Sequence, residues 1–426
     1  MSRRTLEAGK SILIVVLVLI AALLILKTPI YKEMTGEDLT QSLHRLTVPA
    51  VTRSTLTSDQ SSPVPSVIVI GTGHARYAVR YDDRAVGRVY DELHPLLGDV
   101  LRAAEAPRTV SESEWLTALS GSNIYLLYPG RVPLDALSDW LGSDGAPPAS
   151  LPGSVRCLLL CPDADGALLL YYPDESTGEY CVCRTSPALT GRLETLYPNY
   201  PENGALFAYE TDLPLAPATV LLPEPPACPV LTAASVDLTD DTLSDLLTAL
   251  SFNPRTKATY STEEGRVVVE GASVLRIAES GLVTYDSGQE DRLSFPGNAS
   301  DADRIGYARQ LAARTVGAHC GDATLYLMDA VTDDKGGYVI RFGYCLDGLP
   351  ILPEGADCAA CFRLTEDRVD TCTLCYRSYT RTDTLFRLLP EAQAAAAMQV
   401  LGEDGAPLAP GYAGSGPSLE PSWLVL

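Results

Sequence analysis

An unbroken apolar run near the start of the chain limits what the protein can fold into. Residues 11–26, SILIVVLVLIAALLIL, contain no charged side chain. As an α-helix this run is roughly 24 Å long, slightly short of a hydrocarbon core of about 30 Å. Lys10 and Lys27 bracket the run, and their long side chains can reach the headgroups on either side. The sequence therefore predicts a single transmembrane helix over Ser11–Leu26.

Positive charges before this helix predict its orientation. Arg3, Arg4 and Lys10 precede the run, so the positive-inside rule places residues 1–10 in the cytoplasm. A cleaved signal peptide is the alternative, but the following KTPIYKEM contains no small-x-small cleavage site. Because no second apolar run of that length follows, we expect a single-pass protein of the cell membrane whose C-terminal bulk is extracytoplasmic.

The chain beyond the helix is strongly acidic. After Lys27 it carries 28 Lys and Arg against 53 Asp and Glu, a balance of −25. A surface this negative repels phosphate backbones, which argues against nucleic acid as a partner. Residues 47–66 are rich in Ser, Thr and Pro, a composition typical of a tether.

Helix and strand patterns alternate after the tether, which favours an α+β fold of antiparallel sheets packed with helices. In the second half of the chain, the order of a helix followed by short strands occurs twice. A leucine stripe at residues 243, 246, 247 and 250 predicts a helix before several short strands, and a Ser300-x-x-Asp303 capping box opens another helix before further strands. The predicted divisions are a cytoplasmic N-terminus (1–10), the transmembrane helix (11–26), a membrane-proximal segment and linker (27–66), an N-terminal extracytoplasmic domain (67–225), a central helix-plus-meander domain (226–298) and a C-terminal α+β domain (299–426).

Motifs of enzymes are scarce in this sequence. None of the four histidines has the spacing of a metalloprotease site. Gly71 and Gly73 follow an apolar VIVI, but without a third glycine they indicate a plain turn rather than a phosphate loop. No G-x-S-x-G or S-x-x-K motif occurs. We therefore expect no catalytic residues and no cofactor.

Four of the eleven cysteines form two C-x-x-C pairs, CAAC (Cys358, Cys361) and CTLC (Cys372, Cys375). In a soluble protein this pattern would suggest a zinc ribbon. No glycine follows either pair, however, and the flanking residues are typical of strands. A metal site formed by the four cysteines is therefore the alternative and not the first prediction.

A β-hairpin offers a second interpretation of these cysteines. With Glu366-Asp367 at its tip, Leu364 would face Val369. In the same register Cys361 would face Cys372 and Cys358 would face Cys375, and opposed residues of antiparallel strands lie within disulfide reach. The sequence leaves open one or more disulfides, free buried thiols and a metal site.

Several segments, taken in order, resemble the YycH and YycI regulators. They are SFNPRTKATYSTEEGRVVVEGASVLRIAESGLVTYDSG, then GYVIRFGYCLDGLPIL, then LLPEAQAAAAMQVL followed by Tyr412 and PSWLVL. Upstream, RYAVRYDD, SESEWLTAL and IYLLYPGRVPLDAL are similar to the extra N-terminal domain of the YycH branch, and the chain length also favours YycH. The order of these segments carries the resemblance, which spans most of the chain from about residue 67.

The resemblance implies a non-enzymatic accessory regulator of a two-component system. Such proteins bind the wall-sensing histidine kinase (WalK/YycG type) of Gram-positive-type bacteria through a transmembrane helix and extracytoplasmic domains, and they adjust its activity in cell-wall signalling. The implied partners are this kinase and a YycI-like sister subunit. Two alternatives are a membrane-anchored envelope receptor for a small molecule or metal, which would use the cysteine hairpin, and a wall-active enzyme, which the missing motifs disfavour.

One face of the transmembrane helix is predicted to contact the helix of a partner. Ser11, Val15, Val18, Ala22 and Ile25 recur at spacings of four, three, four and three. Small and β-branched residues let helix backbones approach closely in lipid. This face is therefore a candidate interaction surface as well as part of a tether.

Ala22→Leu should weaken the association with a partner helix by about 1 kcal/mol and leave membrane insertion unchanged. A kinase-output reporter, read at matched membrane levels, measures the effect. Leu19→Ile and Leu23→Ile, on the other side of the helix, are the controls and should do little. Unchanged output after replacement of the whole segment by an unrelated helix would show that the segment only tethers.

Overall fold

A computed structural model describes residues 61–73, 75–142, 151–255, 259–263, 265–401 and 408–425. All of them fall in the unit that begins at Ser54. The predicted transmembrane helix and most of the predicted linker lie outside these ranges. Within the ranges, no helix is both long enough and apolar enough to cross a bilayer.

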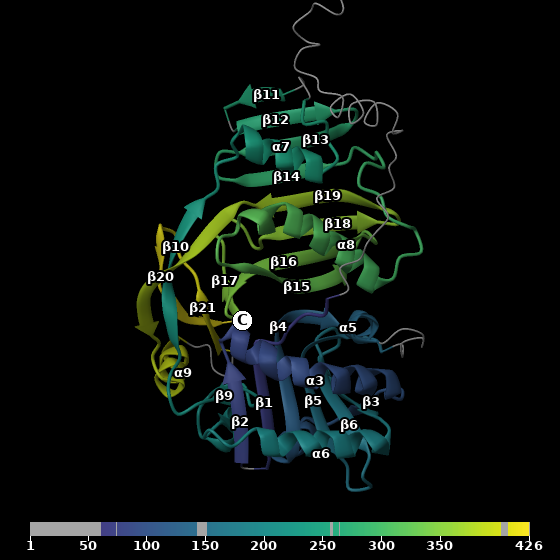
Figure 1. The fold of residues 1–426 in the computed structure, drawn as a ribbon, viewed down its shortest axis with the longest axis vertical. Coiled ribbons are helices and arrows are strands. Elements are labelled where there is room, and N and C mark those ends of the chain that lie inside the picture. The colour runs from purple at the N-terminus through teal and green to yellow at the C-terminus, as the bar shows by residue number, and fades with distance from the viewer. Residues whose placement is uncertain are drawn as a thin grey trace, which may run out of the picture. The chain divides into compact units, whose positions relative to one another are not determined.

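The first half of the described chain forms a seven-stranded antiparallel sheet (Figure 1). In spatial order its strands are β2 (Ala75–Arg80), β1 (Val67–Thr72), β4 (Ser122–Pro133), β5 (Ser154–Pro162), β6 (Leu168–Asp174), β7 (Glu179–Arg184) and β3 (Arg108–Val110). The turn from β1 to β2 holds Gly73 at φ +68°, so the GTG segment is the plain turn that the sequence predicts.

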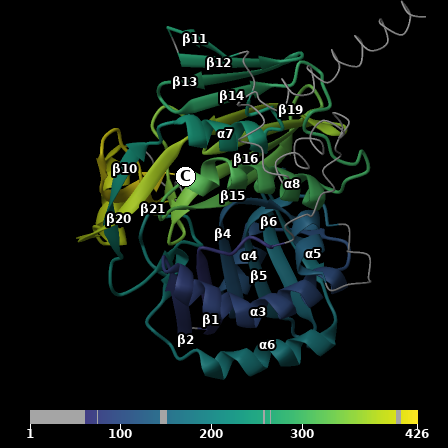
Figure 2. The ribbon, with the colours of Figure 1, turned by 45° about the horizontal axis from the view of Figure 1, so that its top comes forward.

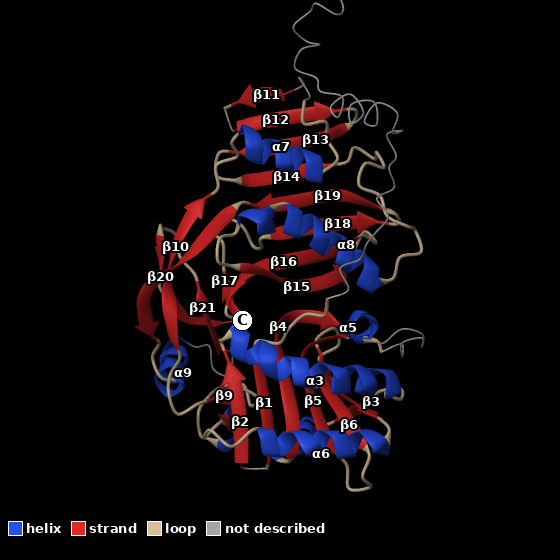
Figure 3. Cartoon of the chain, in the orientation of Figure 1, coloured by secondary structure: helices blue, strands red, loops and turns tan. Residues whose placement is uncertain are grey.

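This sheet is covered on both faces. Val67 and Val69 of β1 pack with α4 (Glu112–Ser120) and with the chain around β8 (Leu206–Phe207) and β9 (Val220–Leu221). Ile68 and Ile70 pack on the opposite side, against α3 (Asp83–Ala103), α5 (Leu134–Leu141) and α6 (Thr190–Leu196), and Figure 3 shows α3 and α6 lying across the strands. Burial on both faces explains why β1 is a continuous apolar run and not an alternating one.

The second half forms an eleven-stranded sheet. In spatial order its strands are β11 (Thr259–Thr262), β12 (Gly265–Glu270), β13 (Ser273–Ala278), β14 (Leu282–Asp286), β19 (Arg368–Cys375), β18 (Ala360–Thr365), β16 (Tyr338–Leu346), β17 (Leu349–Ile351), β21 (Leu408–Tyr412) and β23 (Pro421–Val425), while β15 (Thr324–Thr332) also pairs with β16. Only β17 and β21 pair in parallel among the described strands of this sheet.

The predicted repeat of helix and meander is present. Helix α7 (Asp240–Ala249) precedes β11 to β14, and α8 (Asp301–Arg314) precedes β15 to β19. The Ser300 side chain accepts from the Asp303 amide in the predicted capping box. Both helices lie on the same face of the sheet (Figures 1 and 2). The α+β class is therefore confirmed for the described residues.

Strands on the two sides of the predicted boundary at residue 298 hydrogen-bond to one another. Residues 282–286 of β14 pair with residues 371–375 of β19, which makes one sheet of the central and C-terminal segments. The division into separate domains at residues 225 and 298 stays a prediction.

A third, small sheet combines strands that are far apart in the chain. Its strands are β20 (Arg377–Arg387), β10 (Ala227–Ser235) and β22 (Ser418–Leu419). The helix that follows β20 is α9 (Glu391–Leu401), and the carboxylate of its first residue, Glu391, pairs with Arg80 of β2. Both side chains are at least nine-tenths buried, so this ion pair fixes the C-terminal segment to the first sheet.

Strand β4 makes the direct contact between the first sheet and the eleven-stranded sheet. Its register with β5 jumps from Leu127↔Cys157 to Val132↔Val155, so extra residues of β4 leave the ladder. The detour contains Gly130, where an added Cβ would lie 2.0 Å from the Leu327 carbonyl oxygen of β15. The two backbones meet here without a side chain between them, which only glycine permits.

Gly130→Ala is therefore expected to destabilise the fold by about 1–3 kcal/mol, the usual cost of forcing extra atoms into a packed site. Urea unfolding of the full chain in detergent measures the change. Gly191→Ala is the matched control: this glycine lies in α6 with nothing within 4 Å of an added Cβ. The control should be neutral or stabilise by up to about 1 kcal/mol. Equal stabilities of the two variants would contradict the proposed backbone contact.

Candidate functional site

The predicted cysteine hairpin exists, but its register differs from the prediction. Leu364 pairs with Val369 as predicted. Beyond that pair the register shifts by one residue, so that Cys361 pairs with Thr373 and Phe362 pairs with Cys372. The predicted opposition of Cys361 to Cys372 is wrong.

A β-bulge at Asp370 causes the shift. Arg363 pairs with Thr371 and Leu364 with Val369, which leaves Asp370 as an extra residue in β19. Its carboxylate accepts from Arg363 Nη1 at 2.9 Å, and its carbonyl accepts from the Ser287 amide at 2.9 Å. The bulge is thus held by an ion pair and a backbone hydrogen bond.

The shift also separates the four cysteines. Phe362 and Cys372 point into the core, and since neighbouring residues of a strand point to opposite faces, Cys361 lies on the outer face. The predicted opposition of Cys358 to Cys375 is wrong too, because the Cys375 amide bonds instead to the Ala359 carbonyl at 2.8 Å. The four cysteines therefore do not lie on one side of the sheet, and the described residues contain no cluster of three or more His, Cys, Asp or Glu that could hold a metal.

Cys361 lies in a polar row across the outer face of the sheet. It pairs with Arg341 of β16, which pairs with Asp329 of β15. The Arg341 guanidinium donates to both carboxylate oxygens of Asp329, at 2.8 and 2.6 Å. A cationic group is thus fixed beside the thiol by a bidentate ion pair.

Cys358 lies beside Cys361 because the chain bends at residues 357–359 before β18 begins. The neighbouring Cys358 thiol lowers the pKa of Cys361, and Arg341 lowers it further against the effect of burial. Cys361 and burial in turn raise the pKa of Cys358. The sequence interpretation missed this contact because it extended the strand through Cys358.

The remaining thiols have a different environment. Burial raises the pKa of Cys157 and Cys161 to about 12, and that of Cys228 to about 11. Cys181 is half-buried like Cys361, but burial and the carboxylates of Asp174 and Glu179 raise its pKa. All eleven cysteines are free in the structure.

A second feature is the tether segment (residues 61–66), which precedes β1. The hydrogen bonds that hold it are here called its seat. The Ser66 amide donates to the Leu127 carbonyl of β4 at 2.7 Å, and the Ser62 hydroxyl bonds to Tyr90 of α3 at 2.8 Å. Arg309 of α8 donates to the Ser61 carbonyl. The tether segment is therefore held by a strand and a helix of the first half and by a helix that packs on the eleven-stranded sheet.

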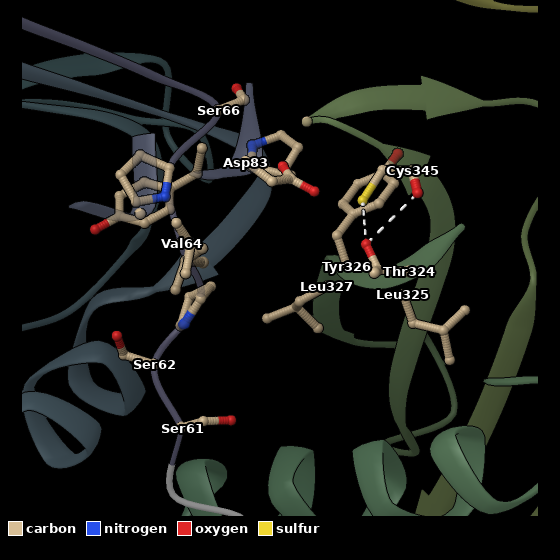
Figure 4. Close-up of a pocket in the computed structure, with 18 of the residues that line it drawn as sticks. Ser61, Ser62, Val64, Ser66, Asp83, Thr324, Leu325, Tyr326, Leu327 and Cys345 are labelled. Carbon is tan, nitrogen blue, oxygen red and sulfur yellow. Dashed lines mark hydrogen bonds between the residues drawn. The ribbon is translucent and has the colours of Figure 1, made fainter. Parts of the chain in front are cut away.

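A cavity of about 380 Å³ lies along the tether segment (Figure 4). Its walls are the tether segment, α3 and β4 on one side and β15, Cys345 and Gly348 on the other. Thr324 Oγ1 and Cys345 Sγ are 3.2 Å apart in its wall. Burial, and next the Asp347 carboxylate, raise the pKa of Asp83 at its edge. The cavity has the size of a small-molecule pocket, yet much of its wall is the tether itself.

The five residues of the predicted helix-contact face are not among these features. Ser11, Val15, Val18, Ala22 and Ile25 lie outside the described residues.

Comparison with solved structures found a neighbour of this chain. No family model matches the chain, and no curated protein matches it. Among solved structures, the crystal structure of YycH from Bacillus subtilis superposes with a TM-score of 0.54 at 14% sequence identity. The match covers 87% of this chain and 95% of the YycH chain. The resemblance noted in the sequence is thereby confirmed at the level of the fold: the chain has a YycH-like fold.

Proposed function

We propose that the chain is a non-enzymatic, membrane-anchored accessory regulator of a sensor histidine kinase. The observation that carries the proposal is the YycH-like fold, which extends over nearly the whole of both chains. A protein that shared only one domain with this chain would match only part of each chain. The proposed partners are the kinase and a YycI-like sister subunit, and the proposed location of residues 67–426 is the extracytoplasmic side of the cell membrane.

The amino-acid sequence supports the same proposal independently of the fold. The apolar run at Ser11–Leu26 supplies an anchor, and basic residues before it favour a cytoplasmic N-terminus. The acidic balance of the rest disfavours nucleic acid and anionic lipid as binding surfaces for the folded part. A protein partner in the same membrane remains the best candidate.

The seat of the tether segment supports a route by which the folded part could act on a partner in the membrane. The tether segment is the chain between the predicted anchor and β1, and it is bound by α3, β4 and α8. A change in the packing of β4 against β15 would therefore alter how the tether is held. Movement of the tether would in turn shift the predicted transmembrane helix against its partner.

Crosslinking in intact cells followed by purification of the full chain tests the proposed partnership. We expect a sensor histidine kinase among the crosslinked membrane proteins, and we expect its recovery to fall when residues 11–26 are exchanged for an unrelated helix. Recovery of transporter subunits without any kinase would favour the receptor alternative and contradict the proposal.

Arg309→Met should loosen the tether segment by roughly 1.5–3 kcal/mol, because a hydrogen bond from a charged donor is lost while the aliphatic part of the side chain stays. Hydrogen exchange of a peptide covering residues 61–66 should become faster, and kinase output should change. Arg314→Met, exposed near the end of the same helix, is the matched control and should alter neither. Faster hydrogen exchange of residues 61–66 with unchanged kinase output would show that signalling does not depend on how the tether segment is held. That result would contradict the proposed route.

A further inference from the structure

Cys358 and Cys361 form a thiol pair on the outer face of the eleven-stranded sheet. The bend at residues 357–359 places Cys358 next to the start of β18, three residues before Cys361. Cys358 is only 9% exposed, whereas Cys361 is half-buried and faces the polar row of Arg341 and Asp329. Cys361 is thus the more accessible of the two and pairs with a cationic residue, whereas Cys358 is buried.

We propose that Cys358 and Cys361 are a redox-active dithiol whose substrate class is small-molecule disulfides. Cys361 is the attacking thiol and Cys358 the resolving thiol. The assignment follows from their positions, since the attacking sulfur must be reached from solvent and its thiolate needs a neighbouring positive charge.

The reaction balances as two thiol–disulfide exchanges. The Cys361 thiolate attacks one sulfur of the disulfide RS–SR, forms a mixed disulfide and releases RS⁻, which takes up a proton. Cys358 then loses its proton and attacks the Cys361 sulfur, which forms the Cys358–Cys361 bond and releases the second RS⁻. The dithiol loses two electrons and two protons, and the substrate is reduced to two molecules of RSH.

Charge distinguishes Cys361 from the other half-buried cysteine. Cys181 is also half-buried, but burial and the carboxylates of Asp174 and Glu179 raise the pKa of its thiol. The two strands of the hairpin need not separate for the reaction, because both cysteines lie at the same end of β18. Cys372 lies on the opposite, buried face of the sheet and takes no part.

Oxidised glutathione is a suitable probe for the reduced full chain in detergent micelles. After reaction and alkylation of remaining thiols, cleavage after Arg and Glu isolates residues 355–363, which contain only these two cysteines. We expect this peptide to lose two hydrogens and to resist alkylation, while Cys181 stays alkylated. Full alkylation of the peptide, or preferential reaction of Cys181, would overturn the proposal.

Single-cysteine variants test the two roles. Cys358→Ser should accumulate glutathione on Cys361, because the resolving thiol is gone. Cys361→Ser should leave Cys358 largely unmodified. Accumulation on Cys358 instead would overturn the assignment, and circular dichroism of each variant verifies the fold.

Arg341 is proposed as a positioning residue for this pair. Arg341→Gln should slow alkylation of Cys361 by roughly 3- to 10-fold at neutral pH, as a raised thiol pKa lowers the thiolate fraction. Arg341→Lys should restore most of the rate. A pH profile of alkylation that is the same in all three proteins would contradict the electrostatic role.

Discussion

The contact between β4 and β15 at Gly130 is the constraint on which the arrangement of the two large sheets depends. If β4 stayed in register with β5, it would have no extra residues to reach β15. A side chain at position 130 would hold the backbones of β4 and β15 apart. Residues of the detour also line the cavity, and Leu127, just before the detour, accepts a hydrogen bond from the Ser66 amide of the tether segment. One irregularity in one strand thus positions the features through which the folded part could act on a membrane partner.

The sequence predicted the local elements well because their signals are local. Capping at Ser300 and the leucine stripe before Leu250 each depend on residues within one or two helical turns. The pairing of β14 with β19 joins segments more than 80 residues apart, and no periodicity in either strand encodes it. The neighbours of β1 in the sheet, β2 and β4, likewise follow from tertiary packing.

The cysteine hairpin shows how one residue changes a candidate site. Its strands and tip were predictable from β-propensity and turn composition, and the first pair, Leu364↔Val369, was correct. The bulge at Asp370 was not predictable, since its partners Arg363 and Ser287 act only once the sheet has formed. Because a one-residue slip moves each side chain to the other face, every cysteine pair assigned across the strands failed. Cys358 and Cys361 lie close together because the chain bends at residues 357–359, and the strand-like residues around CAAC did not indicate this bend.

The most direct test of the central claim is the autophosphorylation rate of the sensor kinase, purified from the same organism, in lipid nanodiscs with and without the full chain. The proposed regulator predicts a saturable change in that rate, which is lost when Ser11–Leu26 is replaced by an unrelated transmembrane helix. An identical rate at every concentration of the chain, under conditions in which both proteins occupy the same nanodisc, would contradict it.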